Sequence, residues 1–539
     1  MMLFWLGSIV VVFTTGAGLF KNDFFEIAKQ IEIFTEAYKQ VNMNYVDEVE
    51  PAKLMDTAIK SMFEELDPYT NFWDAQQVQE GQLLNAESYT GVGVILQERE
   101  NKLLIKQVFK DSPADKAKLK AGDLITHIGD TPVADFQKNT QELLRGAPGT
   151  TVSLTFLRQG KTQKAILKRA HNAQKLVPYY HLKGTVGYIK LSEFGPTAAQ
   201  EVGAALQDLK SQGAQQIILD LRNNPGGLLE EAIKIVNFFI PKGEEVVFTK
   251  SAIEKYNKTY MTQSDPIDTQ IPLAILINAH SASASEIVSG SIQDLDRGVI
   301  IGARSYGKGL VQRVLPLSYE TQMKLTISRY YTPSGRGIQA LDYRHRDSKG
   351  EPRLKKEEGY REFTTRNGRK VDDSGGIKPD IATASAAISE LTQALLNQNL
   401  IFNFATQYFY KHPLSQEGDF EIPPHIFDQF KTYLKTQDFH YKTTLEKDIE
   451  KAFTKETNPD LNQEVASAHQ QLLAQIQVFK EKELHQSKAQ IEQQLTAEIV
   501  KQYGYEEGLY AYNLKYDSTV KKAIETLQDA PSYIHLLGK

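Results

Sequence analysis

Cysteine is absent from the 539 residues of this chain. Its absence excludes thiol catalysis, disulfide bonds and zinc sites built from thiolates. No His-x-x-x-His spacing with an accompanying glutamate is present, so a metalloprotease helix is not predicted either. The charges nearly balance, since Lys+Arg 62 against Asp+Glu 67 gives 62 − 67 = −5, and no basic excess is available for nucleic acid. We therefore expect no metal, no cofactor and no nucleic-acid partner.

Charged residues are also missing from residues 1–20, where an apolar run at residues 3–13 precedes Gly16, Ala17 and Gly18. This pattern is typical of a secretory signal peptide with a small-residue cleavage site, although the usual basic start is missing. A stretch of about 20 such residues is also long enough to anchor a protein in a bilayer. A buried core helix is the third interpretation. We expect export to the cell envelope, such as the periplasm, with cleavage or anchoring left open.

The periodicity of the apolar residues changes along the chain and divides it into blocks. The apolar residues have helical spacing in the first block and strand-like alternation in the second. The third block has the pattern of alternating strands and helices, and helical spacing returns in the last. The predicted fold class is multidomain α/β, with a β-sandwich or barrel-like module beside the α/β core. The predicted boundaries are a signal peptide or anchor at 1–20, N-terminal helices at 22–80, a β-rich block at 85–172, an α/β core at 180–385 and a C-terminal helical extension at 386–539.

Two short segments contain the strongest catalytic candidates, SASASE at residues 281–286 and GKG at residues 307–309. A serine hydroxyl is a weak nucleophile at neutral pH, and lysine can act as its base once burial lowers the pKa of the amine. Ser283 followed by Glu286 also fits a capping box, in which the serine begins a helix. The two roles are compatible, because the N–H groups at a helix start can stabilise an oxyanion. The pattern indicates a serine/lysine hydrolase that uses Ser283 and Lys308.

A glycine turn at residues 226–227 is the third part of the candidate site. It follows an apolar strand predicted at residues 216–221, and Ser283 follows another at residues 273–277. Open α/β sheets place their ligands at such carboxyl ends. Glycine lets the backbone direct N–H groups at a substrate, although the same pair also fits a plain helix-start turn. Acyl transfer requires such donors beside the nucleophile and the base.

The β-rich block resembles a PDZ domain in two of its segments. Residues 89–94 (YTGVGV) form a glycine-rich loop that runs into a strand, and residues 111–125 read DSPADKAKLKAGDLI. A PDZ domain binds an extended peptide by strand addition and holds its terminal carboxylate on loop N–H groups. The alternative is that the two glycines only permit a tight turn. The resemblance implies that substrate tails are bound by Tyr89, Thr90, Gly91, Val92, Gly93 and Val94.

The layout of the chain, with helices first, then this PDZ block and then the α/β core, resembles that of the carboxy-terminal processing proteases. These are tail-specific serine proteases. The likeness extends over about residues 30–382 and includes LDPY at 66–69, DLRNNPGG at 220–227, SASASE at 281–286, GKGLVQ at 307–312, YYTPSGR at 330–336 and GIKPD at 376–380. It implies that Ser283 is the nucleophile, Lys308 the general base and Gln312 the residue that orients the lysine. The oxyanion donors that it implies are the backbone N–H groups of Ala284, Gly226 and Gly227, with Gly227 favoured.

The resemblance predicts an exported endoprotease that cleaves envelope proteins near their carboxyl termini after PDZ recognition of their tails. A catalytically silent PDZ scaffold and a non-peptidase serine hydrolase are the alternatives. Besides substrate tails, the expected partner is a second copy of the chain, with Ile27, Ile31 and Phe34 at or near a two-fold contact. An adaptor or activating protein is a further candidate partner. The extension beyond about residue 385 has no counterpart in the resemblance.

Overall fold

The computed structural model describes residues 23–78, 90–135, 143–171, 175–347, 350–354, 359–373, 375–383, 388–413, 423–453 and 463–539. The predicted signal peptide or anchor at residues 1–20 and the loop residue Tyr89 lie outside these ranges. The chain divides into two compact units, one of residues 1–74 with 314–325 and the other of residues 75–313 with 326–539.

The first unit contains two helices and a short strand, namely α1 (Asp23–Asn44), α2 (Pro51–Glu64) and β1 (Asn71–Trp73). Both helices agree with the helical spacing of the apolar residues. Helix α2 ends before Asp67, whose carboxylate accepts the N–H groups of Tyr69 and Thr70 and so turns the chain. Strand β1 pairs antiparallel with residues 322–324. Within the described ranges, no helix combines the length and the apolar character needed to cross a bilayer.

The PDZ block is built mainly of strands, namely β2 (Thr90–Gly91), β3 (Val94–Arg99), β4 (Lys102–Val108), β5 (Leu124–Ile128), β6 (Thr131–Pro132), β7 (Thr151–Arg158), β8 (Lys161–Lys168) and β9 (Ala170–His171). Its antiparallel sheet has the order β3-β4-β5-β7-β8, with β6 paired to β5. Buried and exposed residues alternate at the start of β7, as expected for a strand with one face on a core. The short helix α4 (Pro113–Lys116) begins after Ser112, whose hydroxyl accepts the N–H of Asp115.

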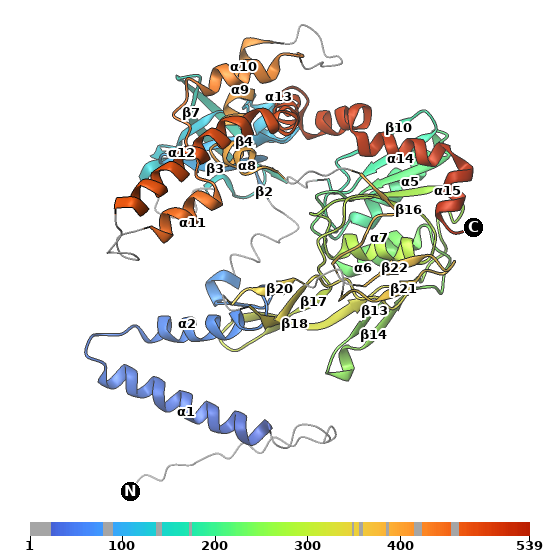
Figure 1. Ribbon diagram of the computed structural model, residues 1–539, viewed down its shortest axis with the longest axis horizontal. Helices are drawn as coiled ribbons and strands as arrows, with labels where there is room; N and C mark the ends of the chain where they lie inside the picture. Colours follow the sequence, from blue (N-terminus) through green and yellow to red (C-terminus); the bar gives the residue numbers. More distant parts are fainter. Residues whose placement is uncertain are drawn as a thin grey trace. The chain divides into compact units, whose positions relative to one another are not determined.

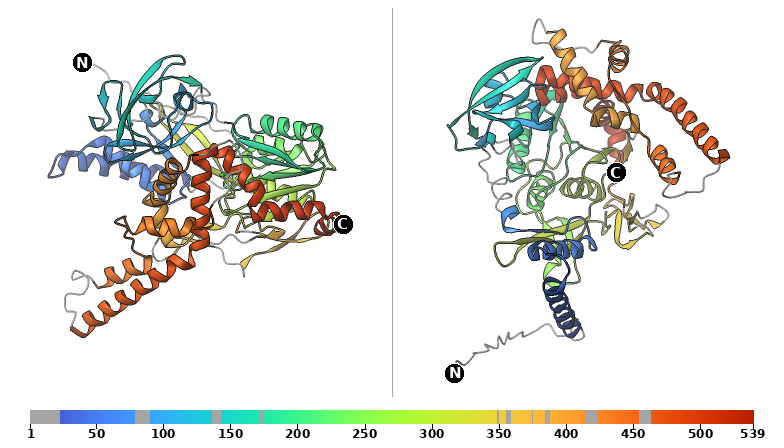
Figure 2. Two further views of the ribbon diagram at one scale, coloured as in Figure 1. Left: turned by 90° about the horizontal axis from the view of Figure 1, so that it is seen from above. Right: turned by 90° about the vertical axis from the view of Figure 1, so that its left-hand side faces the viewer.

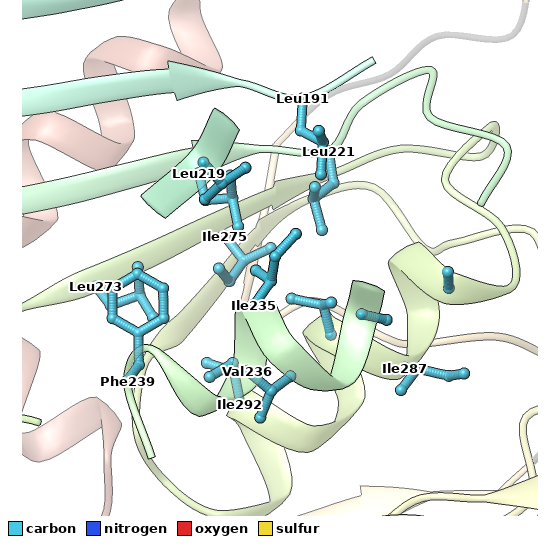
Figure 3. Close-up of a cluster of buried hydrophobic side chains, with 14 of the residues drawn as sticks. Leu191, Leu219, Leu221, Ile235, Val236, Phe239, Leu273, Ile275, Ile287 and Ile292 are labelled. Carbon is cyan, nitrogen blue, oxygen red and sulfur yellow. The ribbon is translucent and has the colours of Figure 1, made fainter. Parts of the chain in front are cut away.

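The α/β core contains a six-stranded sheet, whose strands in spatial order are β10 (Tyr179–Lys183), β11 (Val186–Lys190), β12 (Gln216–Asp220), β15 (Leu273–Ile277), β16 (Val299–Gly302) and β23 (Ile381–Ala382). All neighbours pair in parallel except β10 and β11. Three helices pack on one face, namely α5 (Ala198–Ser211), α6 (Leu229–Asn237) and α7 (Ala284–Asp294). Leu219, Ile275 and Ile292 belong to the buried cluster between them (Figure 3). Strand β15 is buried at every position, because both faces of this sheet are covered.

A second sheet contains β13 (Glu245–Lys250) and β14 (Lys258–Met261), which precede Ser283, and β17 (Leu310–Pro316) and β18 (Gln322–Tyr331), which follow Lys308. β13 pairs antiparallel with β14 and with residues 329–331 of β18. Two antiparallel strand pairs follow in a polar part of the chain, β19 (Leu341–Arg346) with β20 (Pro352–Leu354) and β21 (Glu362–Thr364) with β22 (Lys370–Asp372). Backbone hydrogen bonds hold these strands, and such bonds form whatever the polarity of the side chains.

The C-terminal extension is helical, as its apolar spacing predicts, and contains α8 (Glu390–Asn397), α9 (Leu400–Lys411), α10 (Ile426–Leu434), α11 (Thr444–Ala452), α12 (Gln463–Gln486), α13 (Lys488–Tyr516), α14 (Ser518–Gln528) and α15 (Ala530–Leu536). Helix α13 reaches the PDZ block, where the Tyr505 hydroxyl donates to Asp115 at 2.6 Å. Helix α14 packs on the sheet face opposite α5–α7 through Val520, Ala523 and Leu527 (Figures 1 and 2). The predicted fold class is confirmed.

Candidate active site

Ser283 lies at the turn between strand β15 and helix α7, and its backbone is strained. Its φ of 55° and ψ of −112° form a combination that residues with a side chain rarely adopt. The residue is the N-cap of α7, and the Glu286 carboxylate accepts its backbone N–H at 2.8 Å. The capping-box interpretation and the position expected for a nucleophile therefore apply to the same residue. A strained backbone that is fixed by surrounding hydrogen bonds is typical of functional positions.

Glu286 also binds the segment that contains Lys308. Its Oε2 accepts the N–H of Lys308 at 2.9 Å, and its Oε1 accepts the N–H of Gly307 at 2.7 Å and the hydroxyl of Ser305 at 2.6 Å. Burial raises the pKa of Glu286 to about 7, although these hydrogen bonds favour the charged form. One buried carboxylate thus connects the backbones of Ser283 and Lys308. Sequence reasoning assigned Glu286 only the cap.

Tyr330 connects the same two residues through their carbonyl groups. Its buried hydroxyl lies 2.5 Å from the carbonyl oxygen of Lys308 and 3.1 Å from that of Ser283. A phenol has one proton, so it donates to one carbonyl at a time, and the shorter distance favours Lys308. Tyr330 was noted in the sequence only as part of the segment YYTPSGR. Together with Glu286 it brings the predicted nucleophile and base into one hydrogen-bonded cluster.

The glycine turn packs directly on Ser283. A Cβ added to Gly226, whose φ is 103°, would lie 2.8 Å from the Ser283 Cβ and 3.0 Å from the Ala284 nitrogen. The N–H of Gly226 donates to the Asn224 side chain at 2.9 Å, so it is already engaged. A Cβ on Gly227, whose φ is 142°, would lie 2.4 Å from a backbone oxygen of Phe194. The turn therefore requires glycine at both positions, and Gly227 and Ala284 are the better candidates for oxyanion donors.

Gln312 lies on β17, and its amide nitrogen donates to the Thr326 hydroxyl on β18 at 3.2 Å. Lys308 is half-buried and precedes β17, between Gly307 and Gly309. Gln312 is thus held within β17, and Lys308 lies two residues before that strand begins. Orientation of the lysine by Gln312 stays a prediction.

The predicted tail-binding loop is anchored by its carbonyl groups. The carbonyl of Val92 accepts the N–H of Ala114 at 2.8 Å, and that of Gly93 accepts the N–H of Phe109 at 3.0 Å. Gly91 pairs with a residue of β9, and Val94 begins β3. Because these bonds use carbonyl oxygens, capture of a carboxylate would depend on the N–H groups of the loop. Thr90 lies in β2, and Tyr89 is outside the described residues.

Models of known protein families match this chain in successive segments. "Activating protease CtpB N-terminal domain" matches residues 19–77, "PDZ domain" residues 90–168 and "Peptidase family S41" residues 185–343. A fourth model, "Probable PDZ-protease, C-terminal helical domain", matches residues 391–527, which the sequence resemblance had left unassigned.

Individual proteins are similar over much of the chain. A carboxy-terminal-processing protease of Bartonella bacilliformis is 33% identical over 58% of this chain and 73% of its own. The carboxy-terminal processing protease CtpA of Bacillus subtilis is 31% identical over 56% of this chain and 65% of its own. Among solved structures, a photosystem II D1 C-terminal processing protease is 24% identical with a TM-score of 0.37, and the match covers 66% of this chain and 94% of that one.

Proposed function

Because the chain belongs to the carboxy-terminal processing proteases of peptidase family S41, and is thus a serine-type peptidase, we propose that it cleaves proteins near their carboxyl termini with Ser283 and Lys308 as its dyad. The observation that carries this proposal is the shared support of the two residues. Glu286 accepts the backbone N–H groups of both, and the Tyr330 hydroxyl contacts the carbonyl groups of both. Such a cluster fixes one backbone relative to the other, as a nucleophile and its base require.

In the proposed reaction, the neutral amine of Lys308 takes the proton of Ser283 Oγ while that oxygen attacks the scissile carbonyl carbon. The N–H groups of Gly227 and Ala284 donate to the resulting oxyanion. The protonated Lys308 then gives its proton to the leaving amine, the C–N bond breaks, and the acyl group remains as an ester on Ser283. Water attacks this ester as Lys308 removes its proton. The bond to Ser283 Oγ then breaks, Lys308 returns the proton to that oxygen, and the new carboxyl terminus is released. Gln312 holds the amine by accepting one of its N–H groups with the side-chain oxygen, while the Gln312 nitrogen donates to Thr326.

Hydrolysis of a tailed protein, compared with a small ester, distinguishes this proposal from its alternatives. Purified residues 21–539 should cut the protein near its tail, and Ser283→Ala should be inactive in the same assay. Binding of the tail without cleavage would favour a silent PDZ scaffold. Cleavage of the ester alone would favour a non-peptidase hydrolase.

We also propose that residues 1–20 direct the chain to the cell envelope, since they carry no charge. Cell fractionation with and without these residues measures this, and the mass of the mature chain distinguishes cleavage from anchoring. A cytosolic protein with residues 1–20 intact would contradict the proposal.

Amidation of a substrate tail is expected to weaken its binding to the loop at residues 89–94. We propose that the loop N–H groups hold the terminal carboxylate, so removing its charge should cost about 1.5–3 kcal/mol, the scale of a charge-assisted hydrogen bond. The measurement is calorimetry with the full-length Ser283→Ala protein and matched acid and amide peptides. Equal affinities for the two peptides would rule out carboxylate capture.

Ile31→Glu on α1 is expected to convert a homodimer into a folded monomer. Ile27, Ile31 and Phe34 are 53%, 61% and 45% exposed within the single chain, and a two-fold contact would cover them. A glutamate there would place an unpaired charge in the contact, at a cost of several kcal/mol if it stays desolvated. Light scattering with sizing measures the change, and Lys39→Glu on the same helix is the control, which should stay dimeric. If the unmutated protein is a monomer at micromolar concentration, the proposal is wrong.

A further inference from the structure

Arg222 lies between two carboxylates that come from distant parts of the chain. Its Nε is 3.0 Å from both carboxylate oxygens of Asp220, and its Nη2 is 2.6 Å from one of them. Its Nη1 is 3.1 and 3.0 Å from the two oxygens of Asp517, which belongs to the C-terminal extension. The Arg222 side chain is 17% exposed and that of Asp517 is 18% exposed, so this pair is largely removed from water.

Asp517 adds a carboxylate to the group of charges around the end of strand β12. Lys190 donates to the carbonyl of Arg222, and its amine lies 3.9 Å from Asp220. The Tyr188 hydroxyl donates to Asp220 at 2.7 Å. Burial alone would raise the pKa of Asp220, yet Arg222 and Lys190 hold it well below its usual value. Lys190 and Arg222 thus face Asp220 of the α/β core, and the extension adds two further carboxylates, that of Asp517 against Arg222 and that of Glu506, whose charge also acts on Lys190.

The carboxylate of Asp517 is fixed where the extension meets the sheet. It is the N-cap of α14 and accepts the N–H of Val520 at 2.9 Å. Just before it, the carbonyl of Leu514 accepts the amine of Lys183 on β10 at 2.7 Å. Because α14 is packed on the sheet through buried residues, Asp517 is a rigid rather than a mobile partner of Arg222.

Arg222 is connected to the nucleophile turn by the residues that follow it. The Asn224 side chain donates to the Leu191 carbonyl at 3.1 Å and accepts the N–H of Gly226. The Asn224 carbonyl accepts the N–H of Ala282 at 3.0 Å and the hydroxyl of Ser285 at 2.9 Å. A shift of Arg222 would therefore be passed to the glycine turn and to Ala282 and Ser285, which lie on either side of Ser283 in the sequence.

We propose that Asp517 is a positioning residue of the protease, which holds Arg222 and through it the turn that presents the Gly227 N–H to the oxyanion. The C-terminal extension is then part of the support of the active site. This inference rests on the proposed function, because it takes Gly227 as an oxyanion donor. An ion pair that sets the place of such a donor acts on the rate of the chemical step more than on substrate binding.

Asp517→Asn tests the inference, because asparagine keeps the cap of α14 and removes only the charge. We expect kcat to fall by ~10–100-fold with KM nearly unchanged, as for a small displacement of a reacting group. Asp517→Glu, which restores the charge, should recover much of the lost rate. The matched control is Asp529→Asn, the exposed N-cap of α15 in the same extension, which should keep the wild-type kcat.

Hydrogen exchange distinguishes positioning from simple loss of the extension. In Asp517→Asn we expect faster exchange at residues 222–227 and unchanged protection of α14. Loss of α14 protection, a change confined to KM, or a kcat equal to that of Asp529→Asn would overturn the inference. If the wild-type protein does not hydrolyse tailed substrates, it is the proposed function that fails. In that case the exchange of Asp517→Asn still tests this inference, and unchanged exchange at residues 222–227 would overturn it.

Discussion

Ser283→Ala and Lys308→Ala are each expected to lower the rate of peptide hydrolysis by about 10⁴-fold or more, the scale seen when one member of a catalytic unit is removed. The serine provides the attacking oxygen, and the lysine removes its proton, so neither acts without the other. The double variant should therefore be little slower than either single variant. The measurement is single-turnover cleavage of a tailed protein, with circular dichroism to confirm that each variant is folded.

Lys308→Arg is the sharper control for this prediction, because arginine keeps the positive charge but stays protonated and cannot act as a base. It should be as inactive as Lys308→Ala. A chelator should leave the wild-type rate unchanged. Substantial turnover by Lys308→Ala or Lys308→Arg at neutral pH would exclude the lysine as general base.

Glu286→Gln is expected to lower kcat by about 100-fold and to destabilise the α/β core, since each buried donor left without a partner costs about 1–3 kcal/mol. The carboxylate accepts from Ser283, Ser305, Gly307 and Lys308, whereas a glutamine would direct its own N–H groups at some of these donors. Kinetics and thermal unfolding of the purified variant measure the two effects.

The matched control is Glu446→Gln in the extension. Glu446 is also a buried glutamate at the third position of a capping box, where it accepts the N–H of Thr443 at 3.1 Å. Among the described residues, its hydrogen bonds are to Thr443, Gln477 and Lys480 of the extension, so its replacement should lower stability but leave kcat within about twofold of wild type. Wild-type kcat in Glu286→Gln would show that the shared carboxylate does not position the dyad.

The stability of the protein should also depend on pH through Glu286. Burial raises its pKa from 4.5 to about 7 in the folded chain. The folded state therefore holds a proton that the unfolded state has already released, so this contribution is present below pH 4.5 and is lost as pH rises through 7. The difference in Tm between wild type and Glu286→Gln should be larger at ~pH 5 than at ~pH 8. An equal difference at both values would contradict this.

Local patterns in the sequence determined much of the fold. Strand β15 (Leu273–Ile277) has the bounds that its apolar run predicts, because a strand covered on both faces is apolar at every position. Ser283 was placed correctly at a strand-to-helix turn, since an N-cap serine with a glutamate three residues later is a local signal. The helical character of the extension followed from its apolar spacing in the same way.

Only the tertiary structure decided how the candidate site is held together. Its bonds join residues that are far apart in sequence. Glu286 binds residues 305–308, Tyr330 binds the carbonyl groups of Ser283 and Lys308, and Arg222 binds Asp517. The engagement of the Gly226 N–H by Asn224 likewise depends on the conformation of the turn, which the residue types alone do not specify. Helical and strand periodicity record which side of an element is buried, but not which buried group lies against it. The partners of a buried charge are therefore known only once the chain has folded.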